Sequence, residues 1–214
     1  MSPRSAENLF TALKQQLLLP ILRMSDPQLC LEFCRVLSQE GLGILEITLT
    51  TPDALSLLRT LSAEGLRIGA GTVLTAQAAA AALDAGALFL VSPGLKPEIA
   101  ALAHERNIAY LPGVYTASEV MQALALGLTR LKFFPAKPAG PEYLKHLSGP
   151  FPEIEWLPTG GIEWAEIPQW LDLPLAGIGQ GSRLVSAQAL HTGNWEHIRQ
   201  ELRERVTQCN HWPR

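Results

Sequence analysis

The sequence predicts an α/β fold, and within that class a (β/α)8 TIM barrel with an extra N-terminal helix, in one domain spanning residues 1–214. Three observations predict it. Short apolar runs of strand length alternate with helical patterns along the chain. The centres of these runs fall near residues 20, 46, 68, 89, 110, 132, 156 and 177, so most steps are 21 to 26 residues. The runs are almost continuously apolar, as expected when both faces of a parallel sheet are covered.

The first half of the chain is expected to supply a lead helix and four strand–helix units. Apolar residues recur at helical spacing over residues 9–17, behind Ser5 as N-cap, which predicts a short helix that covers or plugs part of the fold. Asp26-Pro27 is typical of a helix start, because aspartate caps the first turn and proline fits its geometry. Strands are expected near residues 17–23, 44–49, 66–70 and 87–91, with helices near 27–40, 53–61, 75–85 and 95–106.

The second half repeats the pattern. Strands near 108–111, 131–134, 154–157 and 175–178 alternate with helices near 117–126, 142–148 and 164–171, and further helix follows to about residue 206. Residues 179–182 (GQGS) are expected to open the last turn, because glycine closes many such connections. A doubly wound open sheet is the structural alternative. It would show fewer strands before an edge, and none of the runs resembles an edge strand.

Composition limits the classes of function. Hydrophobic residues make up 47% of the chain and charged residues 17%, which favours a compact folded protein over a disordered one. Lys and Arg number 17 against 20 Asp and Glu, with no basic block, so nucleic acid is not an expected partner. The 3 cysteines and 5 histidines lack the spacing of a metal site. The N-terminus lacks the apolar core of a signal peptide and no run is long enough for a membrane span, so we expect a cytoplasmic protein.

One lysine interrupts an otherwise apolar run. If LKFFP (131–135) is a strand, Leu131 and Phe133 lie on one face and Lys132 points to the other. An amine held among apolar groups loses hydration and becomes a usable nucleophile. The alternative is a lysine at the end of an edge strand whose ammonium group reaches water.

The second strand carries a carboxylate into the predicted interior. Glu46, Thr48 and Thr50 share one face of this run, and the apolar residues between them must face the helices, so Glu46 points inward. A buried carboxylate and a buried amine have two interpretations. One is a structural ion pair, which contributes little net stability. The other is iminium chemistry, in which Lys132 condenses with a ketone and Glu46 moves protons.

Further polar residues follow the strands at their carboxyl ends, where barrel active sites lie. They are Arg23, Thr72, Ser92 and Thr159. Two glycine turns accompany them, TGG (159–161) after the seventh strand and GQGS (179–182) after the eighth. Barrels often hold a phosphate at these two positions, against backbone N–H groups and a helix N-terminus, and Ser182 adds a hydroxyl donor. The sequence therefore predicts a phosphate site there.

Six motifs in a fixed order are more specific than any one of these features. They are LEIT (45–48), GAGTV (69–73), VSPG (91–94), LPGV (111–114), LKFFPA (131–136) and LPTGGI (157–162). In this order they closely resemble the motifs of the 2-keto-3-deoxy-6-phosphogluconate (KDPG) aldolase family, also called 4-hydroxy-2-oxoglutarate (KHG) aldolase. The resemblance covers roughly residues 17–186.

The resemblance implies a class I aldolase, usually a homotrimer of small barrels, that splits KDPG into pyruvate and glyceraldehyde 3-phosphate. No metal or organic cofactor is expected, because the iminium group withdraws the electrons. Lys132 would form the Schiff base and Glu46 would be the general acid/base. The remaining roles would be Thr72 for the pyruvate carboxylate, Pro93 and Phe134 for the pocket wall, and Gly160, Gly161, Gly181 and Ser182 for the phosphate.

One position departs from the family pattern. Many members have arginine where this chain has Thr50, and that arginine contacts the substrate carboxylate. We expect Arg23, at the end of the neighbouring first strand, to replace it. Thr159 favours the gluconate substrate, since a hydroxyl at this position accompanies gluco stereochemistry in the family. The alternatives are the same chemistry on the galactonate epimer or on KHG, and, outside enzymes, a non-catalytic phosphosugar-binding barrel.

Overall fold

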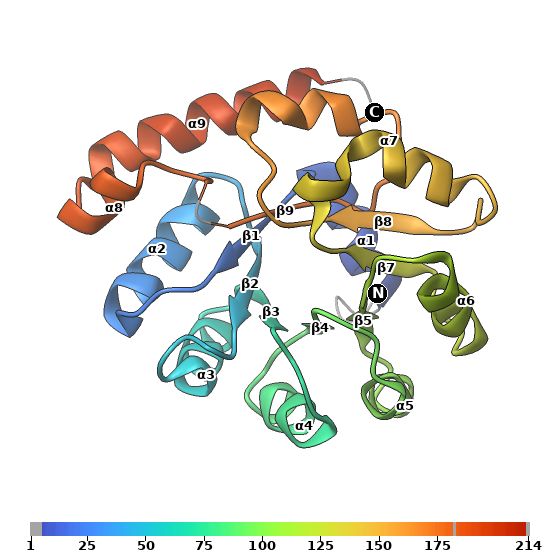
Figure 1. Ribbon diagram of the computed structural model, residues 1–214. Helices are drawn as coiled ribbons and strands as arrows, with labels where there is room; N and C mark the ends of the chain where they lie inside the picture. The colour runs from blue at the N-terminus through green and yellow to red at the C-terminus, as the bar shows by residue number, and fades with distance from the viewer. Residues whose placement is uncertain (1–5, 182, 213–214) are drawn as a thin grey trace.

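The computed structural model of the protein describes residues 6–181 and 183–212. Its centre is a curled sheet of parallel strands with helices around the outside (Figure 1). Six strands pair in the order β5-β4-β3-β2-β1-β9. Their bounds are β1 Leu18–Leu22, β2 Ile44–Thr48, β3 Arg67–Gly71, β4 Phe89–Val91, β5 Ala109–Leu111 and β9 Ile178–Gln180.

Three further parallel strands pair in the order β6-β7-β8. They are β6 Gly113–Val114, β7 Arg130–Phe133 and β8 Glu155–Pro158. Only Pro112 separates β5 from β6 along the chain. At the other side, parallel bridges join Trp156 to Leu175 and Thr159 to Gly179, next to β9. Pro112 and these bridges therefore connect the two sets of strands.

Helices follow most of the strands. They are α1 Ala6–Gln16, α2 Pro27–Gln39, α3 Ala54–Ala63, α4 Ala76–Asp84, α5 Pro97–Glu105, α6 Ala117–Ala125, α7 Ala136–Ser148, the 3-10 helix η1 Trp164–Trp170, α8 Ala187–Thr192 and α9 Trp195–His211. The cap predicted before α2 is confirmed, because the Asp26 carboxylate accepts hydrogen bonds from the backbone N–H groups of Gln28 and Leu29. Among the described helices, none is both long and apolar enough to cross a membrane.

The alternating faces of the strands divide the core into two parts. Leu45 and Leu131 belong to a large cluster between the sheet and the outer helices. Ile44, Phe89 and Ala109, each the first residue of its strand, belong to a smaller cluster on the inner face of the curl.

Helix α1 fills one end of this inner space. Its residues Leu9, Phe10 and Leu13 are buried in the inner cluster, with the residues that begin the strands. The Arg130 guanidinium, at the start of β7, lies 4.4 Å from the centroid of the Phe10 ring. The strand ends opposite α1, where the strands finish, carry the predicted site residues.

Two elements differ from the sequence expectation. The last strand, predicted over 175–178, begins at Ile178 and includes Gly179 and Gln180, which the sequence assigns to a turn. A Cβ at Gly179 would lie 2.3 Å from the Thr159 hydroxyl oxygen, so this glycine allows close strand contact. Helix α7 begins at Ala136 rather than near residue 142, and Gly140 (φ 75°) separates its first turn from the predicted helix.

Candidate active site

Lys132 points to the inner face of the sheet. Its neighbours Leu131 and Phe133 pack in the outer cluster, and Lys132 itself is only 7% exposed. The Lys132 ammonium lies 5.1 Å from the centroid of the Phe134 ring, which is 37% exposed. This burial is incompatible with an edge-strand lysine that extends into water. The amine is held against an aromatic ring, near the strand ends opposite α1.

Glu46 lies on the same inner face and is 1% exposed. Among the described residues, neither carboxylate oxygen has a hydrogen-bond partner. Burial raises the pKa of Glu46 above its ordinary value, and the nearby positive charges of Lys132 and Arg23 offset only part of that rise. An ion pair serving only stability would satisfy the carboxylate with hydrogen bonds. The Glu46 carboxyl group is instead buried with both oxygens unpaired among the described residues.

Glycine makes room for this carboxylate. Strand β3 pairs with β2 so that Gly71 stands opposite Thr48 and Gly69 opposite Glu46. A Cβ at Gly71 would lie 1.8 Å from the Glu46 Oε1 atom, and this distance is too short for two atoms that are not bonded. Gly71 therefore fixes the space that Glu46 occupies. Gly71 is absent from the predicted site residues, although a glycine inside a strand is itself a sign of close approach.

Arg23 and Thr72 stand together beside Glu46. The Arg23 Nη2 group donates a hydrogen bond to the Thr72 hydroxyl at 3.2 Å. Thr72 has a left-handed backbone (φ 55°), a conformation that β-branched residues rarely adopt. Thr50 is exposed, and its hydroxyl pairs with that of Thr48 at 3.0 Å. A guanidinium and a hydroxyl are thus placed next to the buried carboxyl group, whereas Thr50 contributes to a threonine cluster.

Phe134 links the amine to the first glycine turn. A Cβ at Gly160 would lie 3.1 Å from the Phe134 ring, and the centroid of the same ring is 5.1 Å from the Lys132 ammonium. Gly160 (φ 104°) and Gly161 (φ 81°) both have left-handed backbones, which only glycine adopts without strain. Gly181 is exposed after β9, and Ser182 lies outside the described residues.

The last two predicted site residues border this region. Thr159 is 5% exposed, and its hydroxyl donates to the Leu157 carbonyl oxygen at 3.1 Å. Pro93 is exposed in the loop after β4. A Cβ at Gly113 would lie 2.2 Å from the Pro93 carbonyl oxygen. The loop after β4 therefore packs directly against the first residue of β6. Pro93 thus contacts β6 and Thr159 follows β8, which are the two strands that flank Lys132 on β7.

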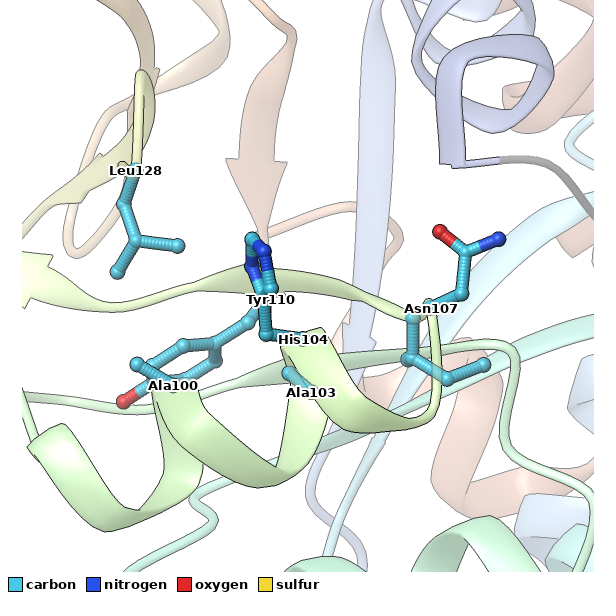
Figure 2. A pocket seen from close by; sticks show the side chains of 7 residues that line it. Ala100, Ala103, His104, Asn107, Tyr110 and Leu128 are labelled. Carbon is cyan, nitrogen blue, oxygen red and sulfur yellow. The ribbon is translucent and has the colours of Figure 1, made fainter. Parts of the chain in front are cut away.

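A separate hollow of about 120 Å³ lies outside the sheet. Its lining comes from α5, β5 and the segment before β7, and includes His104, Asn107 and Tyr110 (Figure 2). Tyr110 points to the outer cluster, while its neighbours Ala109 and Leu111 point to the inner one. The sheet therefore separates this hollow from Lys132, and none of its lining residues belongs to the site described above.

Comparisons with known proteins identify the family of the chain. The chain matches the family described as KDPG and KHG aldolase over residues 9–201. It is 38% identical over 197 residues to the 2-dehydro-3-deoxy-phosphogluconate aldolase of Pseudomonas aeruginosa, which covers 91% of this chain and 90% of that protein.

Two solved structures are similar over nearly the whole chain. One is the KDPG aldolase of Legionella pneumophila with pyruvate captured as a covalent carbinolamine, at 33% identity and a TM-score of 0.84, covering 94% of this chain and 97% of that one. The other is the KDPG aldolase of Zymomonas mobilis ZM4 with 3-phosphoglycerate, at 32% identity and a TM-score of 0.86, covering 98% of each chain. The chain therefore belongs to the KDPG and KHG aldolase family, whose members are carbon–carbon lyases.

Proposed function

We propose that this chain cleaves KDPG to pyruvate and glyceraldehyde 3-phosphate, with Lys132 as the Schiff-base lysine and Glu46 as the general acid/base. One observation carries the proposal: a buried carboxyl group, unpaired among the residues that the structure describes, lies within electrostatic reach of a buried amine. A covalent carbinolamine of pyruvate in the Legionella pneumophila relative supports the same chemistry for this chain.

The reaction needs an amine, a proton acceptor and a dry environment. The Lys132 nitrogen attacks the C2 carbonyl carbon of the substrate, and loss of water leaves an iminium ion. The C4 hydroxyl gives its proton to Glu46, the C3–C4 bond breaks, and its electron pair moves into the iminium group to form an enamine. Glu46 then returns the proton to C3, and water hydrolyses the resulting iminium to release pyruvate. Glu46 thus begins and ends each turnover in the same protonation state.

Binding roles follow from the same arrangement. Arg23 with Thr72 would hold the substrate carboxylate, since a guanidinium and a hydroxyl both donate to it. Phe134 and Pro93 would form the wall above Lys132, and Thr159 would contact the sugar hydroxyl. Phosphate would bind at the glycine turns through Gly160, Gly161, Gly181 and Ser182. The 3-phosphoglycerate bound to the Zymomonas mobilis relative supports a phosphate position in this family.

The larger architecture is part of the same proposal. We infer that Pro112 and the bridges beside β9 close the strands into an eight-stranded barrel with α1 as an extra helix, in one domain over residues 1–214. We also propose a cytoplasmic homotrimer. A monomeric mass by light scattering would rule out the trimer without affecting the chemistry.

Reduction in the presence of pyruvate tests the function. Borohydride is expected to convert the iminium into a stable amine, and peptide mass spectrometry should locate the added pyruvate on Lys132. Cleavage rates for KDPG, its galactonate epimer and KHG should then rank the substrates, with KDPG first. The epimer is the second candidate, because Thr50 replaces an arginine found in many gluconate enzymes. If borohydride leaves no adduct on the chain, the proposal fails.

Gly71→Ala is expected to lower kcat by about 10²-fold or more, because the new methyl group must displace the Glu46 carboxyl from its position. Steady-state kinetics and the yield of trapped pyruvate check this together, since Lys132 itself is untouched. Gly43→Ala is the matched control, because Gly43 also has no left-handed backbone and its added Cβ would meet only the end of the Arg67 side chain, at 3.9 Å. A normal kcat in Gly71→Ala would show that Glu46 is not needed where it lies.

Arg23→Ala is expected to raise KM for KDPG by about tenfold, because the substrate carboxylate loses its cation. Arg59→Ala, an exposed arginine on α3, is the control. The effect should be equally large with KHG, which carries the same keto-acid carboxylate. If KM does not change, another group holds the carboxylate.

A further inference from the structure

Two cations and two carboxylates gather at the glycine turns, and the predicted site includes none of them. Lys137 belongs to the first turn of α7, and its N–H group donates to the Gly160 carbonyl at 3.0 Å. A Cβ at Gly161 would lie 3.1 Å from the Lys137 Cβ and 3.4 Å from its Cδ. The Lys137 side chain therefore runs along the turn after β8.

Arg183 reaches the same place from the turn after β9. Its Nη1 atom is 2.6 Å from the Glu163 Oε1 atom, and the Lys137 ammonium is 3.1 Å from that same oxygen. Glu166 lies 3.3 Å from the Lys137 ammonium on its other side. One carboxylate oxygen of Glu163 thus bridges two cations that come from different strand ends.

The ion pairs are open to exchange. The four side chains are between 36% and 55% exposed, and ion pairs at such exposure contribute little to stability. A phosphate monoester near neutral pH carries about two negative charges and three acceptor oxygens, against one charge on a carboxylate. It therefore competes well for a guanidinium and an ammonium already held at the correct separation for a bridging oxygen.

We propose that Lys137 and Arg183 form a cationic clamp for the substrate phosphate, and that Glu163 occupies this clamp until the phosphate displaces it. The inference rests on the proposed function, and it names the side chains that select phosphorylated substrates. The backbone N–H groups of the glycine turns would fix the position of the phosphate, while the clamp supplies its counter-charge. Glu163 prevents the empty clamp from holding weaker anions.

The preference for KDPG over KHG distinguishes a clamp from surface ion pairs, because replacing Glu163 should change it in the opposite direction to replacing either cation. Arg183→Ala and Lys137→Ala should each lower the ratio of kcat/KM for KDPG to kcat/KM for KHG by about tenfold. Arg183→Lys should recover part of that loss. Glu163→Gln should change the ratio in the opposite direction, by about threefold, and inorganic phosphate should inhibit this variant at lower concentrations than the unaltered chain. Lys145→Ala, on the same helix, and Arg106→Ala are controls expected to leave the ratio unchanged.

Failure of the clamp is separable from failure of the proposed function. Trapping pyruvate on the unaltered chain involves no phosphate, so an adduct together with KDPG cleavage establishes the chemistry by itself. If both occur but Arg183→Ala and Lys137→Ala keep the substrate ratio, the clamp is wrong. If Glu163→Gln weakens inhibition by inorganic phosphate, Glu163 supports the phosphate site rather than competing for it, and the exchange is wrong.

Discussion

Lys132→Met is expected to lower kcat by about 10⁴-fold or more, because no other group of the site replaces the amine in forming the Schiff base. Methionine keeps the length and apolar character of the buried side chain, so the variant should remain folded. Borohydride with pyruvate should leave it unlabelled. Steady-state cleavage of KDPG and mass spectrometry of the reduced protein measure the two effects.

Lys132→Arg separates the nucleophile from the charge. Arginine keeps a positive charge near Glu46 but stays protonated, so it cannot attack a carbonyl carbon. If Lys132 served only to balance the Glu46 carboxylate, this variant would retain most of the activity. We expect it to be as inactive as Lys132→Met.

Glu46→Gln is expected to lower kcat by about 10²- to 10⁴-fold, because the amide cannot accept the C4 hydroxyl proton. Lys132 remains, so slow trapping of pyruvate should persist. The unaltered chain should lose activity as pH falls through the pKa of Glu46, which burial raises, and Glu46→Gln should lack this acidic limb. A pH profile of kcat/KM for both proteins tests the assignment, and an unchanged limb in the variant would contradict it.

The same substitution should stabilise the fold. The folded-state pKa of Glu46 is raised above its unfolded value, so its contribution to stability is complete at acidic pH and is lost as pH rises through the folded pKa. Glutamine carries no charge at any pH. We therefore expect Glu46→Gln to melt about 2–4 °C higher than the unaltered chain at pH 8 and at the same temperature near pH 4.

Thermal melts at both pH values measure this difference. Glu153→Gln makes the same chemical change at an exposed position and should have no effect. An equal gain at both pH values would show that the stabilisation does not come from removing a buried charge. If Glu46→Gln loses activity and melts at a higher temperature at pH 8, activity and stability oppose each other at this residue, as is common for catalytic groups.

Much of the fold follows from local patterns. The apolar runs predicted the strands within a few residues, and alternation along β2 and β7 predicted that Glu46 and Lys132 point inward. These predictions succeed because the period of a strand is a local property. Resemblance to family motifs then identified the aldolase family, which the comparisons confirm.

Contacts between distant segments could not be predicted in the same way. The role of Gly71 depends on a carboxylate from the neighbouring strand. Local sequence favours a turn at Gly179, and only its contact with Thr159 explains why it lies in a strand. Lys137 and Arg183 look like isolated surface charges in the sequence. Only the fold brings both of them to one oxygen of Glu163, which is 26 residues from Lys137.

The position of α1 bears on how a substrate would reach Lys132. Its apolar side chains close the inner space at the end where the strands begin, so we expect a substrate to approach Lys132 from the end where the strands finish. In the proposed mechanism pyruvate would stay covalently attached to Lys132 until the iminium is hydrolysed, whereas the aldehyde fragment would be free once the C3–C4 bond breaks. The aldehyde must depart first. Kinetically, glyceraldehyde 3-phosphate should inhibit only the pyruvate-loaded enzyme, and pyruvate should compete directly with KDPG.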